Sequence, residues 1–341
     1  MSSKRIVELD LARAIAVIGV VVIHGSAYAL RESVNGGTAY NISIILNQLS
    51  RFSVPLFVLM SGVGLSLSYK KEKGYIYFLI HRLGKILPLY IIWSVVYLTL
   101  VNKDFNYSLW INKIIKGDRV FYHLYYMPMI IKLYLVFPLL YSFMKRRAGL
   151  FISFLITAGV TFSAHYYNVP NLQLDFFQKR NTIFWFFYFV LGVFISSNIT
   201  SIIDKIRSHK KMVAFISFIS SVGIILECHI SLNTDKSLDY ATTFIRPSII
   251  VYSVVFSAFL VILKIKSKFL LKFLKNISNN SYVIYLSHPL VLYYYIKLLK
   301  DMNISIGNVY FIITSIILCT FIPAIFGTIV RKLKLVIKKS F

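Results

Sequence analysis

Three ionisable residues interrupt a long apolar run near the start of the chain, and their spacing suggests chemistry. The run from Asp10 to His24 carries ionisable side chains only at Asp10, Arg13 and His24. An α-helix turns by roughly 100° per residue, so the eleven steps from Arg13 to His24 return to the same face, roughly 16 Å further along the axis. Asp10 precedes Arg13 by three residues, close enough to pair with it. Ionisable groups inside a bilayer usually face a cavity or the bundle interior for a functional reason.

His24 is the strongest candidate for a catalytic group. A neutral imidazole accepts a proton near physiological pH, which suits a general base that activates a hydroxyl. The alternative is a packed histidine that is hydrogen-bonded between helices. The presence of Arg13 on the same helix face favours the functional interpretation.

Arg82 and Lys85 form a second feature. They are three residues apart and share a helix face. With Arg13 they are expected to make a cationic pocket for phosphate groups, which Arg binds in bidentate fashion and Lys as a point charge. Basic residues at a cytoplasmic helix end also follow from the rule that orients membrane proteins, and this second explanation stays open.

Three polar or aromatic segments supply the remaining candidates. The first runs from Arg51 to Ser61 and Gly62, where helix packing is favoured over a nucleophilic Ser61. In the second, His123 and Tyr126 belong to an aromatic cluster that suits either a sugar platform or an interfacial belt. In the third, Tyr285 and His288 share a face just before a proline, which frees a backbone carbonyl; a polar core contact is equally compatible.

The composition identifies an integral membrane protein. The 341 residues are 57% hydrophobic with a mean hydropathy of +0.71, whereas soluble domains are about 45–50% apolar. The net charge of +26 comes from basic residues in short loops between apolar spans, which argues against a nucleic-acid partner. Cys228 and Cys319 lie in predicted spans, so no disulfide is expected. No metal-spaced cluster or Gly-rich phosphate loop is found, and the first apolar run lacks the cleavage site of a signal peptide.

The apolar runs predict an all-α bundle of about ten transmembrane helices within one membrane domain that covers residues 1–341. The expected ranges are 9–30, 43–69, 75–101, 121–143, 149–167, 181–197, 212–230, 245–263, 280–299 and 307–330. Most of the 38 Lys and Arg residues then fall on the side that holds both termini, which is therefore expected to be cytoplasmic. The segment 102–120, on the other side, is expected to contain an interfacial helix.

These residues together resemble the membrane-bound acyltransferase 3 family of bacterial O-acyltransferases. The resemblance extends from Ile6 to about Tyr295. Its most specific part is Arg13, ten intervening residues and His24, preceded by Leu9-Asp10-Leu11. The family's Arg-x-x-Arg pair is here Arg82-x-x-Lys85, which keeps the charge and loses one bidentate fork. The other matching segments are Pro55-Leu56-Phe57 with Ser61-Gly62, Phe121-Tyr122-His123-Leu124, and Tyr285-Leu286-Ser287-His288.

The resemblance implies a membrane O-acyltransferase with no bound cofactor or metal. It implies transfer of an acyl group, acetyl before succinyl, from cytoplasmic acyl-CoA to a hydroxyl of a cell-surface or lipid-linked glycan. The most similar members are those that acetylate enterobacterial common antigen or modify poly-N-acetylglucosamine. The chain is expected to lie in a bacterial plasma membrane, without the extracytoplasmic SGNH domain of some relatives and with a homodimer as one alternative for its assembly.

The implied roles follow the matched motifs. His24 would act as general base or transient acyl carrier, supported by Arg13, and the donor would be held by Arg13, Arg82 and Lys85. Acceptor or supporting roles fall to Asp10, Arg51, Ser61, His123, Tyr126, Tyr285 and His288. Two other functions remain open: a transporter or flippase for a lipid-linked saccharide, and a scaffold for a polysaccharide synthase. The lack of a detectable inverted repeat weakly disfavours the transporter.

Overall fold

The structure is a computed structural model that describes residues 7–167, 181–234 and 236–340. Every regular element in these ranges is helical, which agrees with the all-α class expected from the sequence. The chain forms two compact units. Unit 1 comprises Met1–Leu56, Asp204–Phe244 and Ser248–Phe341, and unit 2 comprises Phe57–Ile203 and Ile245–Pro247.

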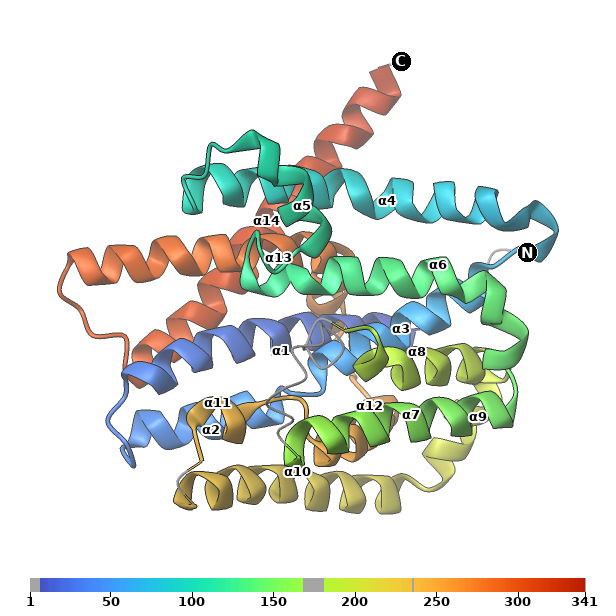
Figure 1. Cartoon of the computed structure of the whole chain (residues 1–341), viewed down its shortest axis with the longest axis horizontal. Helices are drawn as coiled ribbons and strands as arrows, with labels where there is room; N and C mark the ends of the chain where they lie inside the picture. Colours follow the sequence, from blue (N-terminus) through green and yellow to red (C-terminus); the bar gives the residue numbers. More distant parts are fainter. Residues whose placement is uncertain (1–6, 168–180, 235, 341) are drawn as a thin grey trace. The chain divides into compact units, whose positions relative to one another are not determined.

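Unit 1 is built around its first helix, α1 (Val7–Glu32). This helix lies between α13 (Lys268–Asp301) and α2 (Thr38–Leu49) and also contacts α14 (Val309–Ser340) (Figure 1). Its small and apolar side chains are buried along most of its length, as expected for a helix with partners on several sides. The other helices of this unit are α10 (Lys210–Asn233), α11 (Leu238–Thr242) and most of α12 (Pro247–Ile262).

The range 43–69, expected as one helix, consists of α2 and α3 (Ser53–Ser68). The break falls just before Pro55, which has no N–H to donate and is tolerated in the first turn of a helix but not in its interior. The Ser53 hydroxyl donates to the carbonyl oxygen of Ser50 at 2.7 Å and stabilises the connection. Arg51 is therefore located at a helix junction and not within a helix.

α13 begins twelve residues before the expected start at residue 280. Ser267 caps its first turn, because the Ser267 hydroxyl accepts a hydrogen bond from the backbone N–H of Leu270 at 3.3 Å. The added turns carry Lys268, Lys272 and Lys275. Such charged turns continue a helix beyond its apolar part, so hydropathy alone does not detect them.

Unit 2 contains α4 (Gly74–Val96), α6 (Tyr126–Met144), α7 (Arg147–Tyr166) and α8 (Ile183–Ser196). In this unit α8 contacts both α6 and α7, and α4 contacts α6. Thr157 joins α7 to α8, because its hydroxyl donates to the carbonyl oxygen of Ile183 at 2.8 Å. The unit also contains α5 (Trp110–Lys116), most of α3 and the start of α9 (Ile199–Ser208).

The described residues contain seven helices that are long and apolar enough to cross a bilayer. The number is eight if α8 and α9, which are bent by 99° at their junction, count as one span. α2 and α3 together count as one span, whereas α1 and α13 do not belong to this set. A multi-pass membrane protein is thus supported, while the ten-span count and the cytoplasmic location of both termini stay predictions.

Candidate functional site

The candidate site in unit 1 is centred on a pair of histidines. The rings of His24 on α1 and His288 on α13 are stacked, with centroids 5.3 Å apart and an angle of 29° between the ring planes. His288 is completely buried, whereas His24 keeps part of its surface accessible. A substrate can therefore reach part of the His24 residue, whereas His288 can act only through its neighbours.

A proline determines which nitrogen of His288 carries the proton. Pro289 has no N–H, so the carbonyl oxygen of Tyr285 lacks its helical donor. His288 Nδ1 lies 2.9 Å from this oxygen and 2.9 Å from the carbonyl oxygen of Ile284. Because carbonyl oxygens only accept, Nδ1 must be the donor and Nε2 carries the lone pair in the neutral ring. The freed carbonyl expected from the sequence is thus used to fix a tautomer.

The residues that flank His24 on α1 are held by an amide from α2. Asn47 is buried, and its Nδ2 donates to the carbonyl oxygen of Ile23 at 3.1 Å and to the Ser26 hydroxyl at 3.2 Å. The guanidinium of Arg51 donates to Asn47 Oδ1 at 2.5 Å. Arg51 also interacts electrostatically with His24. The same amide therefore holds the backbone carbonyl that precedes His24 and the side chain of Ser26, and it also orients a cation.

The expected pair of Asp10 and Arg13 is present near the N-terminus of α1. Asp10 Oδ1 lies 3.7 Å from Arg13 NH1 and accepts a hydrogen bond from the Ser278 hydroxyl on α13 at 3.2 Å. The Arg13 side chain remains 40% exposed. α1 is one continuous helix from Val7 to Glu32, so Arg13 and His24 share a rigid element. A half-exposed guanidinium at one end and an imidazole further along suit an extended anionic ligand.

Arg82, Lys85 and Ser61 belong to unit 2, whereas Arg13 belongs to unit 1. Arg82 donates to the Ser68 hydroxyl, and Lys85 is exposed on the same helix, α4. The cationic pocket of Arg13, Arg82 and Lys85 stays a prediction. Beside Ser61, a Cβ atom at Gly62 would clash with the carbonyl oxygen of Phe189, so this segment packs closely against α8.

His123 is buried in unit 2 among aromatic rings. Its ring centroid lies 5.3 Å from that of Tyr97 and 5.8 Å from that of Phe121. Tyr126 begins α6, and its ring centroid is 6.4 Å from that of Phe57. The role of these residues on the acceptor side stays a prediction.

The structure thus places His288 and Arg51 beside His24 within unit 1, Tyr285 beside His288, and Asp10 beside Arg13 along α1. Sequence analysis missed Asn47, Ser26 and Ser278, which connect these groups. A polar amide within an apolar span usually hydrogen-bonds to a neighbouring helix, so the position of Asn47 in the range 43–69 was a usable signal. Among the described residues, no three His, Cys, Asp or Glu side chains are placed to hold a metal ion.

Comparison with known proteins supports an enzymatic identity for this arrangement. A family model described as an acyltransferase domain matches residues 6–328. No curated protein and no solved structure shows significant similarity to the chain. The match covers nearly the whole sequence and includes every residue of the histidine site. The chain therefore belongs to the acyltransferase 3 family and is a membrane acyltransferase.

Proposed function

We propose that the protein transfers an acyl group, with acetyl as the first candidate, from cytoplasmic acyl-CoA to a hydroxyl group of a cell-surface or lipid-linked glycan in a bacterial plasma membrane. The single observation that carries this proposal is the partly accessible His24 stacked on the buried His288. Membership in an acyltransferase family favours this function over a saccharide transporter, which needs no reactive imidazole.

His24 is proposed as the general base. It takes the proton of the acceptor hydroxyl while the oxygen attacks the thioester carbonyl. The carbon–sulfur bond breaks, the CoA thiolate leaves, and the proton on His24 passes to that thiolate. The products are an ester and free CoA, so atoms and charges balance without a further reactant.

His288 is proposed as a positioning residue for His24. Its Nδ1 is committed to two backbone carbonyls, and its Nε2 presents a lone pair. The neutral His288 ring, stacked on His24, is proposed to hold the His24 ring in one orientation while it takes up and releases the proton. Because His288 is completely buried, this support reaches the substrate only through His24.

Two cations of unit 1 supply charge stabilisation. Arg51 interacts with His24 and is oriented by Asn47, so it is proposed to stabilise the negative charge that develops on the thioester oxygen. Arg13 is proposed to bind the donor phosphates through its half-exposed guanidinium. Arg82 and Lys85 remain proposed donor ligands on the basis of their charge and the family motif.

The proposal is tested with purified protein in nanodiscs and radiolabelled acetyl-CoA, with crude membrane glycolipids as acceptors. His24→Ala is expected to lower label transfer by about 10²–10⁴-fold, the usual contribution of a general base. Label retained on the wild-type protein would indicate a covalent acyl intermediate. His24 would then be assigned as an acyl carrier in place of a general base.

Ser33→Ala, at the residue that follows the last residue of α1, is the matched control, because the Ser33 hydroxyl donates to the carbonyl oxygen of Ala29 in the last turn of that helix. It should leave transfer unchanged. Equal transfer by the His24 variant and the wild type would overturn the assignment of His24. An absence of donor turnover in all proteins would overturn the proposed reaction.

A further inference from the structure

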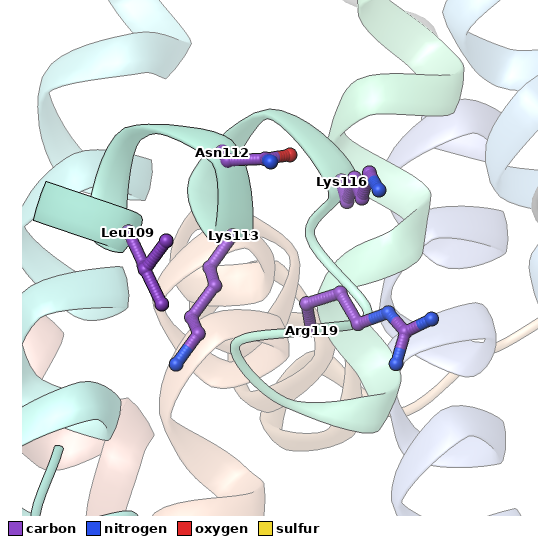
Figure 2. A pocket seen from close by; sticks show the side chains of 5 residues that line it. All are labelled: Leu109, Asn112, Lys113, Lys116 and Arg119. Carbon is purple, nitrogen blue, oxygen red and sulfur yellow. The ribbon is translucent and has the colours of Figure 1, made fainter. Parts of the chain in front are cut away.

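A basic pocket in unit 2 carries none of the residues discussed so far. It has a volume of about 360 Å³ and is lined by Leu109, Asn112, Lys113, Lys116 and Arg119. Figure 2 shows the first four along α5 and the turn before it, and Arg119 on the turn after it. Its volume falls within the range of about 300–1,000 Å³ that is typical of small-molecule sites.

The pocket residues and the exposed apolar residues lie on different faces of α5. Leu109, Asn112, Lys113 and Lys116 follow the spacing of one helix face. Ile111 and Ile115 lie on a different face and are 72% and 68% exposed. An exposed apolar face beside a basic one is typical of a helix that lies in the membrane interface. A helix is thus present in the segment 102–120, and its exposed Ile111 and Ile115 suit the interfacial location that the sequence predicts for this segment.

Two of the three cations in the pocket have no counter-charge. Lys113 Nζ lies 2.5 Å from Asp104 Oδ2, and this bond, with a backbone N–H from Asn106, lowers the pKa of Asp104. The exposed side chains of Lys116 and Arg119 have no hydrogen bond or ion pair with any residue that the structure describes. The pocket therefore has an excess of positive charge that an anionic ligand can neutralise.

The backbone that carries Arg119 is held on both sides. Gly117 has φ +70°, and a Cβ atom there would lie 2.5 Å from the carbonyl oxygen of Leu124, so the turn requires glycine. The Asn102 amide donates to the carbonyl oxygen of Val120 at 2.8 Å. Arg119 thus projects from a fixed turn, and the pocket exists without a ligand to order it.

We propose that this pocket binds the phosphate group of a lipid-linked glycan that serves as acceptor. Arg119 would bind two phosphate oxygens in bidentate fashion, Lys116 would act as a point charge, and the Asn112 amide would reach a hydroxyl of the attached sugar. In the predicted topology the segment 102–120 faces the outside. The inference rests on the proposed function, because it treats the ligand of this pocket as the acceptor.

The test compares two soluble probes on the full-length protein in phosphatidylcholine nanodiscs. One is a decyl phosphoryl N-acetylglucosamine and the other an uncharged decyl N-acetylglucosaminide. Lys116→Gln with Arg119→Gln is expected to weaken binding of the phosphorylated probe by about tenfold and to leave the uncharged probe within twofold. Raising the salt concentration should remove most of the difference between the probes.

A control removes two cations that do not line the pocket, Lys103→Gln with Lys297→Gln, and is expected to leave both affinities within twofold. Equal affinity of the two probes for the wild type would overturn the proposal. It would also be overturned if the control variant lost as much affinity for the phosphorylated probe as the pocket variant does. A third arm adds phosphatidylglycerol to the nanodiscs. If phosphatidylglycerol displaces the phosphorylated probe as effectively as an excess of unlabelled probe does, the pocket is a site for lipid headgroups. The acceptor assignment is then overturned.

Probe binding tests the pocket and acetyl transfer tests the proposed function, so the two measurements distinguish failure of one proposal from failure of the other. Loss of phosphorylated-probe binding in the pocket variant, with unchanged acetyl transfer to the uncharged probe, supports both proposals. Absence of acetyl transfer to either probe, with the binding difference intact, removes the acyltransfer scheme and the acceptor assignment while the anion site remains.

Discussion

The histidine site of unit 1 and the basic pocket of unit 2 differ in how they hold their own polar side chains. At the histidine site, side chains are fixed by bonds to backbone carbonyls: His288 to Ile284 and Tyr285, and Asn47 to Ile23. In the basic pocket, Lys116 and Arg119 extend from a fixed turn and helix into an open space without partners among the described residues. One region is organised before a ligand arrives, and the other offers unneutralised charge.

This difference matches the demands of two kinds of task. Chemistry requires reacting groups to be held within a fraction of an ångström, which buried hydrogen bonds achieve. Recognition of a charged headgroup depends on long-range attraction and tolerates mobile side chains. Substitutions at the first region should therefore change rates, and substitutions at the second should change affinities.

The largest effect in this comparison is expected from Arg51→Gln, which keeps an amide donor for Asn47 and removes the charge near His24. We expect kcat to fall by about 10²–10³-fold with little change in KM for either substrate, as when a group that stabilises an oxyanion is lost. Steady-state kinetics with labelled acetyl-CoA measures both constants. Arg31→Gln, which removes an exposed arginine paired with Asp239 at 3.0 Å, is the control and should have no effect. A change in KM alone would show that Arg51 binds substrate and does not support catalysis.

A smaller effect is expected from Pro289→Ala. The new N–H can bond to the carbonyl oxygen of Tyr285 and compete with His288 Nδ1. The fixed tautomer should become a mixture, and the rate should fall by up to about tenfold. Nitrogen NMR of ¹⁵N-labelled histidine reports the tautomer directly, and Pro323→Ala on α14 controls for removal of a helix proline. An unchanged tautomer with a reduced rate would contradict the role given to Pro289.

The smallest effect is expected from Asp104→Asn in unit 2. This change releases Lys113 from its ion pair, so affinity for the phosphorylated probe should rise by about two- to threefold.

Because the pKa of Asp104 is lowered, the pair stays intact from neutral pH down to about pH 4, and its stabilisation is lost only as the pH falls through the lowered pKa. Probe affinity of the wild type should therefore be flat between about pH 5 and pH 8. A rise in affinity on moving from pH 8 to pH 5 would show that another group controls the pocket.

The sequence was informative where a feature is local. Composition gave the membrane class, and helical spacing gave the Asp10–Arg13 pair at 3.7 Å. A helix, α5, is present in the segment where an interfacial helix was expected, and the freed carbonyl before Pro289 does find a donor. Hydropathy failed where charge or proline modifies a helix. It missed the break between α2 and α3, and it missed the first twelve residues of α13, among which three lysines are interspersed.

The sequence by itself determined the all-helical membrane class, the family motifs and the shared face of Arg13 and His24, because these depend on composition and on the geometry of a single helix. Only the tertiary structure decided that His288, more than 260 residues after His24, stacks on it, and that Asn47 donates to the backbone carbonyl of Ile23. Likewise, only folding showed that Lys116 and Arg119 line one pocket. Such pairings depend on which helices pack together, and one sequence carries no periodic signal for contacts between distant segments.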